Sequence, residues 1–161
     1  MITAFARPFS KSILVTERKL ALNSFSIQLA LELGQLAVKT ASIRDLPIAV
    51  EIRIQDWIIF HASLPGSTSE NQSWIDRKAQ VVSLKNHSTL YERISAEERG
   101  VDWYKENNVS EDTYAIHGGG FPLIVKKQGF VGSLLISGLP HLEDHAFCVD
   151  ILTKFIKPEG K

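Results

Sequence analysis

The 161-residue sequence predicts an α+β fold in which helices flank one antiparallel sheet. Two observations support this fold class. Apolar and polar residues alternate in two pairs of neighbouring segments, and a short turn joins each pair, as in β-hairpins. Helical segments precede, separate and follow these hairpins, whereas a parallel α/β fold alternates single strands with helices. The length fits one domain over residues 1–161, in which residues 1–16 are expected to form an arm.

The first predicted helix covers residues 25–40, with Ser24 or Ser26 as its N-cap. Its apolar residues lie around more than one side of the helix: Ile27, Leu31, Leu33, Leu36 and Val38. Since a single sheet covers one side of a helix, the other side is predicted to contact a partner subunit. The alternative is that residues 85–116 fold over that side within the same chain.

The remaining elements follow from the period of the apolar residues. A first hairpin is predicted from strands at 48–54 and 57–62, and a helix follows at 71–84. Residues 85–116 are polar and irregular. Within them, short helices are expected at 91–99 and 101–107. A second hairpin is then expected from strands at 121–126 and 130–137. The last helix begins near Pro140, because an early proline and the acidic Glu143 and Asp144 suit a helix N-terminus.

Composition excludes several classes of protein. Eighteen basic and eighteen acidic residues cancel, so the chain lacks the positive field with which proteins bind nucleic acid. No apolar stretch approaches the roughly 20 residues of a membrane span. Cys148 is the single cysteine, which excludes an intrachain disulfide and a cysteine zinc site and suits a buried core residue. A cytoplasmic protein is predicted; the alternative, a mitochondrial presequence, rests on Arg7 and Lys11 without an acid in the first sixteen residues.

The sequence HGGGFP is the most informative local motif. It comprises His117, Gly118, Gly119, Gly120, Phe121 and Pro122. Consecutive glycines can turn successive N–H groups toward one side and form a nest for an anion. Arg77 and Lys78 would add positive charge. The alternative is that the glycines permit a tight strand entry, while Arg77 and Lys78 lie on a solvated helix face.

Enzyme motifs do not accompany this loop. A glycine loop of this kind forms part of the oxyanion hole in some esterases, but that chemistry requires a G-x-S-x-G nucleophile elbow, which the sequence lacks. Both nucleotide-binding glycine motifs are missing as well. The sequence therefore favours a binding protein over an enzyme.

The five histidines are considered as ligands of a metal or of haem iron. His141 and His145 are four residues apart on one helix face, but the H-E-x-x-H glutamate is missing and a helix N-terminus disfavours cations, so no metal site is predicted. His61 shares a strand side with Trp57 and is expected to be half-buried. Any histidine can ligate haem iron, although no C-x-x-C-H attachment motif is present.

Several of these motifs together resemble a known family. They are Glu51-Ile52-Arg53, Phe60-His61-Ala62, Leu64-Pro65-Gly66, Trp74 with Arg77-Lys78, the HGGGFP loop, Ser137-Gly138-Leu139-Pro140 and Asp144-His145. Over residues 17–156 the chain resembles the small cytosolic branch of the GlcG/HbpS-like family, which is also called the haem-degrading domain family. It departs from the family pattern at Glu51, where aspartate is usual, and at Gln55-Asp56, where Asn-Gly is commoner.

The resemblance implies a profilin-like fold and homo-oligomers built from dimers. In such a fold the glycine loop lies beside the Ser137-Gly138 strand end and the start of the last helix, where an anion would be stabilised. The predicted ligand-binding residues are His117, Gly118, Gly119, Gly120, Phe121, Arg77, Lys78, Ser137 and His145. The predicted function is a non-enzymatic cytosolic homo-oligomer that binds a small anion or a protein partner at this loop. The alternative is a haem-binding or haem-degrading protein with His61, His117 or His145 as the iron ligand.

Overall fold

The computed structural model describes residues 7–157 and confirms the α+β prediction. Its elements are α1 (Ser10–Lys19), α2 (Ile27–Ile43), β1 (Ala49–Ile54), β2 (Trp57–Ser63), α3 (Glu70–Lys85), α4 (Thr89–Arg99), α5 (Trp103–Asn107), β3 (Gly120–Val125), β4 (Gly129–Ser137) and α6 (His141–Ile156). The four strands form one antiparallel sheet in the order β2-β1-β4-β3. Both predicted hairpins are therefore present, within one residue of the expected bounds, and β1 and β4 join them at the centre.

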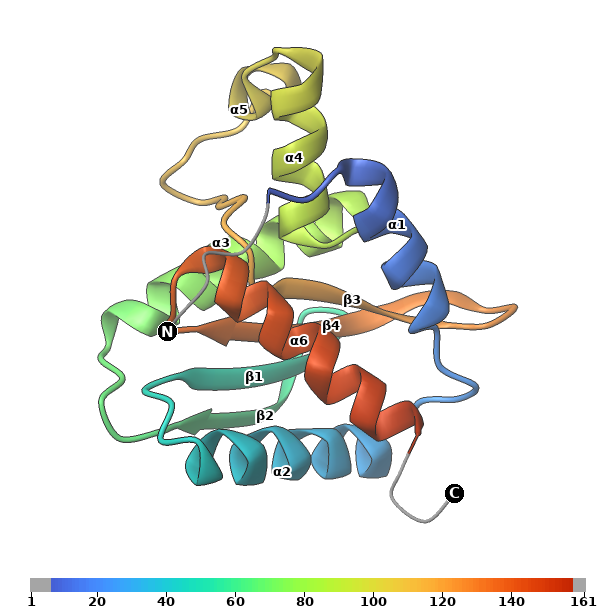
Figure 1. The fold of residues 1–161 in the computed structure, drawn as a ribbon, viewed down its shortest axis with the longest axis vertical. Coiled ribbons are helices and arrows are strands. Elements are labelled where there is room, and N and C mark those ends of the chain that lie inside the picture. The colour runs from blue at the N-terminus through green and yellow to red at the C-terminus, as the bar shows by residue number, and fades with distance from the viewer. Residues whose placement is uncertain (1–6, 158–161) are drawn as a thin grey trace.

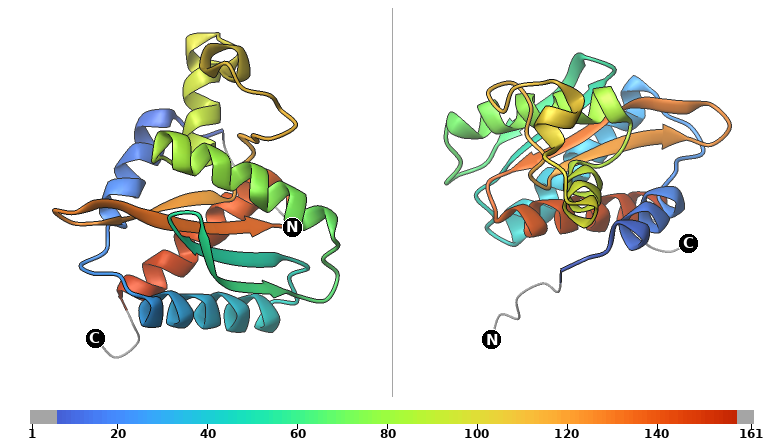
Figure 2. Two further views of the ribbon diagram at one scale, coloured as in Figure 1. Left: turned by 180° about the vertical axis from the view of Figure 1, so that it is seen from behind. Right: turned by 90° about the horizontal axis from the view of Figure 1, so that it is seen from above.

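Helices cover the two faces of this sheet (Figures 1 and 2). Helices α2 and α6 lie on one face, where Val50 and Ile52 of β1 belong to the main apolar core. Helix α3 lies on the other face, where Ala49 and Leu135 contact Ile75. This alternation along each strand is what the period-two pattern predicted. Of the two predicted caps for α2, Ser26 is the one used, because its hydroxyl accepts a hydrogen bond from the Leu29 N–H at 3.1 Å.

The N-terminal segment contributes a helix. Residues 10–16, within the predicted arm, form the first part of α1, while residues 1–6 lie outside the described part of the chain. Ile13 of α1 packs against Leu90 and Ile94 of α4. The buried Glu17 accepts hydrogen bonds from the backbone N–H and the hydroxyl of Ser88, at 3.1 and 2.8 Å. Helix α1 is thereby docked onto α4.

The two short helices predicted within residues 85–116 are present as α4 and α5; α4 begins two residues earlier and α5 two residues later than expected. These helices lie at the opposite end of the molecule from α2 (Figure 1), in contact with α1 and α3. This segment therefore does not cover α2. Most of the apolar residues that predicted a second contact side are covered within the chain, since Leu33 is fully buried and Leu36 and Val38 pack against the main core. Ile27, from the same set, is 48% exposed. Within residues 7–157, no helix is both long and apolar enough to cross a membrane.

Candidate ligand-binding site

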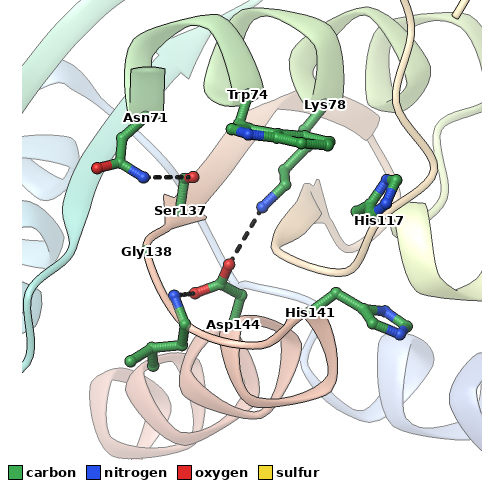
Figure 3. A pocket seen from close by; sticks show the side chains of 9 residues that line it. Asn71, Trp74, Lys78, His117, Ser137, Gly138, His141 and Asp144 are labelled. Atoms are coloured by element: carbon green, nitrogen blue, oxygen red, sulfur yellow. Dashed lines mark hydrogen bonds and ion pairs between the residues drawn. The ribbon is translucent and has the colours of Figure 1, made fainter. Parts of the chain in front are cut away.

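A pocket of about 290 Å³ opens where α3, the end of β4, the start of α6 and the loop at His117 meet (Figure 3). We call it the Lys78 pocket. Its lining residues are Asn71, Trp74, Lys78, His117, Ser137, Gly138, Leu139, His141 and Asp144. Helix α3 supplies the first three because residues three and four positions apart share one face of a helix. Most of these side chains are polar.

A buried ion pair forms one wall of the pocket. The Lys78 ammonium lies 3.2 Å from Asp144 Oδ2, and both side chains are 3% exposed. Lys78 Nζ also donates to the Ile136 carbonyl at 2.8 Å, and the Leu139 N–H donates to Asp144 Oδ1 at 3.0 Å. Burial lowers the pKa of Lys78 and raises the pKa of Asp144 to about 6, although their attraction opposes both shifts.

Two histidines, His117 and His141, line the pocket on the side away from Asn71 (Figure 3). The His117 ring lies 4.6 Å from the Trp74 ring, edge to face, and 6.0 Å from the His141 ring. Burial, together with the smaller effects of the nearby charges of Arg93 and Lys78, lowers the pKa of His117 to about 4. The pKa of His141 is lowered for the same reasons. Both imidazoles are therefore neutral at pH 7, and each can donate one N–H or accept one hydrogen bond.

The glycine triplet passes close to this ion pair. The Gly118 N–H donates to His141 Nδ1 at 3.4 Å and the Gly120 N–H to Thr89 Oγ1 at 3.0 Å, so these two amides have acceptors within the protein. Gly119 has φ +123°, and a Cβ there would overlap the Ile136 carbonyl oxygen and lie 2.7 Å from Lys78 Nζ. The triplet thus permits a close approach, which supports the tight-packing alternative; whether the loop also binds an anion stays a prediction.

The structure brings some of the predicted site residues together and separates others. Lys78, His117 and Ser137 line the pocket. Arg77 lies outside, because its Nε donates to the Glu111 carbonyl at 2.9 Å and its guanidinium stacks on Trp74 at 4.5 Å. Phe121 is 1% exposed and belongs to the main core.

Sequence reasoning missed other lining residues as ligand contacts: Asn71, Trp74, His141 and Asp144. One available signal was the spacing of Asn71, Trp74 and Lys78, which places three polar or aromatic groups on one helix face. A second was the three-residue spacing of His141 and Asp144 in the first turn of a helix.

His145 lies at a second pocket, of about 300 Å³, between α1, α4 and α6. We call it the His145 pocket. Its lining residues are Pro8, Ser12, Ile13, Thr16, Leu90, Leu142, His145, Ala146 and Val149. Burial lowers the pKa of His145 to about 4. The buried Nδ1 atoms of His145 and His117 have no hydrogen-bond partner among residues 7–157.

His61 belongs to neither pocket. Its Nδ1 lies 2.9 Å from Glu51 Oε1 and its Nε2 lies 3.0 Å from Ser63 Oγ, so both ring nitrogens are engaged. The fully buried Glu51 also accepts hydrogen bonds from Arg53 and Gln72. In the described part of the chain, no group of three His, Cys, Asp or Glu side chains is arranged to bind a metal ion.

The fold and the two pockets define an α+β protein that covers one antiparallel sheet with helices on both faces. The chain belongs to the family described as haem degrading protein HbpS-like, whose model matches residues 25–153. A UPF0303 protein of Streptomyces avermitilis is 38% identical over 97% of this chain and 96% of its own length.

Two crystal structures share the fold. The Ybr137w protein superposes with a TM-score of 0.85 at 24% identity, covering 93% of this chain and 89% of that one. A PduOC–haem complex superposes with a TM-score of 0.69 at 18% identity, covering 83% and 96%.

Proposed function

We propose that this protein is a cytoplasmic homo-oligomer that binds a small anionic ligand in the Lys78 pocket and does not turn it over. The observation that carries the proposal is the Lys78 amine, which is buried yet lines the pocket. Burial, and after it the positive charges of Arg93, Lys78 and Arg77, lower the pKa of His117 on the same pocket. An anion there would meet favourable charge in a site that is partly screened from water.

The donors around the pocket suit the oxygen atoms of an anion. The Lys78 ammonium, the neutral imidazoles of His117 and His141, and the amide of Asn71 can all donate hydrogen bonds. A volume of about 290 Å³ lies at the lower end of known ligand pockets, which favours a compact ligand. A protein partner that presents an acidic side chain at the same place is the related alternative.

A thermal-shift titration with small carboxylates tests the proposal. Lactate is expected to raise the melting temperature in a saturable way, because a ligand that binds only the folded state stabilises it. His117→Ala is expected to weaken this effect several-fold, whereas the matched variant His61→Ala, outside the pocket, leaves it unchanged. A set of small carboxylates, phosphate and sulfate that all fail to stabilise the wild-type protein would remove the proposal.

Self-association is supported by exposed apolar side chains. Ile27 and Ile43 of α2 are accompanied by Trp57 and Ile58 on the edge strand β2, which are 64% and 48% exposed. Large exposed apolar groups on an open sheet edge favour pairing with a second chain. Light scattering is expected to give a multiple of 18.0 kDa, and Trp57→Ser is expected to reduce that mass. A persistent monomer mass at rising protein concentration would contradict this part of the proposal.

Haem binding is the second candidate function, because one feature of the His145 pocket favours it. His145 is a neutral, buried imidazole among mainly apolar side chains, which is the environment of many axial haem ligands. The pocket volume, about 300 Å³, would enclose only part of a porphyrin. One structural relative is a haem complex, at 18% identity. Bound haem would supply redox and oxygen chemistry, and His145 would orient it.

A haem titration followed by the Soret band distinguishes the candidate ligands. If His145 binds the iron, His145→Ala abolishes a saturable Soret shift, while His117→Ala and His61→Ala retain it. A wild-type protein without a saturable shift, or a shift that all three variants retain, would eliminate histidine-ligated haem.

A further inference from the structure

We propose that the Lys78 amine captures the carbonyl group of a small 2-oxo carboxylate as an imine inside the Lys78 pocket. This inference rests on the proposed anion binding and names the ligand class. It begins from the position of the amine, which lines an open pocket although the side chain is only 3% exposed. A buried ion pair often contributes little to stability, so stability alone does not explain why Lys78 and Asp144 are paired at the edge of a pocket.

The geometry leaves the amine one position for a ligand. An ammonium group carries three N–H bonds. Two of these directions are used, toward the Ile136 carbonyl at 2.8 Å and Asp144 Oδ2 at 3.2 Å. Gly119 provides the room for this arrangement, since a Cβ there would lie 2.7 Å from Lys78 Nζ. The glycine triplet and the lysine therefore form one structural unit, which accounts for the motif more fully than a tight turn alone.

The surroundings of Lys78 favour a nucleophilic amine. Burial disfavours the ammonium and so lowers the pKa of Lys78, which raises the fraction of neutral amine at a given pH. Burial likewise favours the protonated form of Asp144. Proton transfer from Lys78 to Asp144 gives a neutral amine beside a neutral acid, which is the pair that imine formation needs.

The reaction balances with these two groups alone. The amine lone pair forms a C–N bond, and the carbonyl π electrons move to oxygen. Asp144 gives its proton to this oxygen and takes one from nitrogen, which yields a neutral carbinolamine. A second proton from Asp144 releases the hydroxyl as water while the nitrogen lone pair forms the C=N bond. The product is a protonated imine beside the Asp144 carboxylate, so the starting ion pair and its net charge are preserved.

The remaining pocket residues indicate why the carbonyl compound should carry a carboxylate. His117, beside Trp74, and His141, in the same helical turn as Asp144, are neutral imidazoles that line the pocket. The Asn71 amide, which donates to Ser137 Oγ at 3.1 Å, lies at the other end of the pocket (Figure 3). A carboxylate adjacent to the carbonyl can accept from these groups while the carbonyl carbon reaches Lys78. A simple aldehyde would leave the donors without a partner.

Reductive trapping tests the inference. The full chain is incubated with pyruvate and sodium cyanoborohydride, which reduces an imine to a stable amine, and intact mass and peptide mapping follow. One adduct per chain, located on Lys78, is expected. Lys78→Arg loses it, while the matched variant Lys154→Arg, which changes an exposed lysine, keeps it. An adduct spread over surface lysines, or no adduct, overturns the inference; mapping of the wild-type chain decides this even if Lys78→Arg fails to fold.

Lactate separates this inference from the proposed function. It carries the same carboxylate as pyruvate, but a hydroxyl replaces the carbonyl, so it cannot form an imine. Excess lactate is expected to slow trapping by pyruvate several-fold. If lactate stabilises the protein but pyruvate leaves no adduct on Lys78, anion binding stands and imine formation falls. If neither compound acts, imine formation falls; anion binding falls with it when the other small carboxylates, phosphate and sulfate also fail to stabilise the protein.

Discussion

The start of α6 lies between two pockets of nearly equal size, and each pocket contains a buried titratable residue of α6. The two residues differ in whether a partner compensates their charge. His141 and Asp144 line the Lys78 pocket, whereas Leu142 and His145 line the His145 pocket. Burial favours the neutral form of Asp144 and of His145 alike, and it shifts their pKa values in opposite directions. Asp144 nevertheless has a cationic partner and a backbone donor, while the Nδ1 atom of His145 has no partner in the described structure.

This difference indicates what each pocket can bind. A buried acid and base in contact keep a proton that can move between them, so the Lys78 pocket suits polar, charged or reactive ligands. A buried imidazole without a partner is stable only as the neutral form, so the His145 pocket suits an apolar ligand or a metal-centred one. The following experiments test this contrast.

The largest effect is expected from Lys78→Met. The variant leaves Asp144 buried without its cation, and breaking a buried pair in this way costs about 3–5 kcal/mol of unfolding free energy. Urea denaturation at pH 7 measures the loss. The control Lys154→Ala removes an exposed cation 3.7 Å from Asp150 and is expected to cost less than about 1 kcal/mol.

The dependence on pH identifies the cause of this loss. Protonation of Asp144 removes the unpaired charge, so the deficit of Lys78→Met should shrink as the pH falls. A deficit that is the same at pH 7 and pH 5 would mean that lost packing, rather than lost charge compensation, destabilises the variant.

A smaller loss is expected from Gly119→Ala, at about 2–3 kcal/mol. The new methyl group must move the Ile136 carbonyl or Lys78 Nζ, and φ +123° is unfavourable for alanine. Gly129→Ala is the matched control, because Gly129 has φ +103° but no atom within 4 Å of its Cβ position. The difference in unfolding free energy between the variants isolates the close contact. Equal losses would show that backbone conformation alone requires glycine.

The third test concerns the pH dependence contributed by His145. Its pKa is about 4 in the fold and 6.5 in the unfolded chain, so the unfolded state takes up the proton first as the pH falls. The contribution of neutral His145 to the unfolding free energy is fully present above pH 6.5 and is lost as the pH falls from 6.5 to 4. The loss amounts to about 2 kcal/mol at pH 5. His145→Phe removes this loss, and because Nδ1 has no hydrogen bond to give up, stability at pH 7 should change little. Urea denaturation at pH 7 and pH 5 measures the unfolding free energy of both proteins. If the variant loses as much stability between these pH values as the wild type, other groups cause the pH dependence.

The elements of the fold were predictable because their causes are local. The alternation of apolar and polar residues around Val50 and Ile52 predicts a strand regardless of which helix packs on it. The Ser26 hydroxyl caps α2 through a contact with Leu29, three residues away, and needs no tertiary contact. Helix α1 was missed because its stability comes from Ile13 and Glu17 contacting α4, more than 70 residues later in the chain.

The Lys78 pocket was only partly predictable, because it depends on contacts between distant segments. The motif at 117–120 marked one wall, and Lys78 was chosen for its charge. The pair of Lys78 with Asp144 joins residues 66 positions apart, and spacing along the chain carries no sign of it. Arg77, next to Lys78, faces away from the pocket because neighbouring residues on a helix point about 100° apart.

The smallest predicted effect tests the contrast between the pockets directly, by adding the same charge to each. Asn71→Asp retains an oxygen that can accept the Thr68 N–H at 2.8 Å, and the Ser137 hydroxyl can donate to its second oxygen in place of the amide hydrogen bond to Ser137 Oγ. Stability should therefore change little, but the new carboxylate repels an anion in the Lys78 pocket. Lactate affinity should fall roughly five- to tenfold, or about 1–1.4 kcal/mol. Ser12→Asp places a carboxylate at the His145 pocket and should leave lactate affinity unchanged. Isothermal calorimetry measures both. Equal weakening by the two variants would mean that lactate responds to the general field of the protein, and the distinction between a charged and an apolar pocket would then fail.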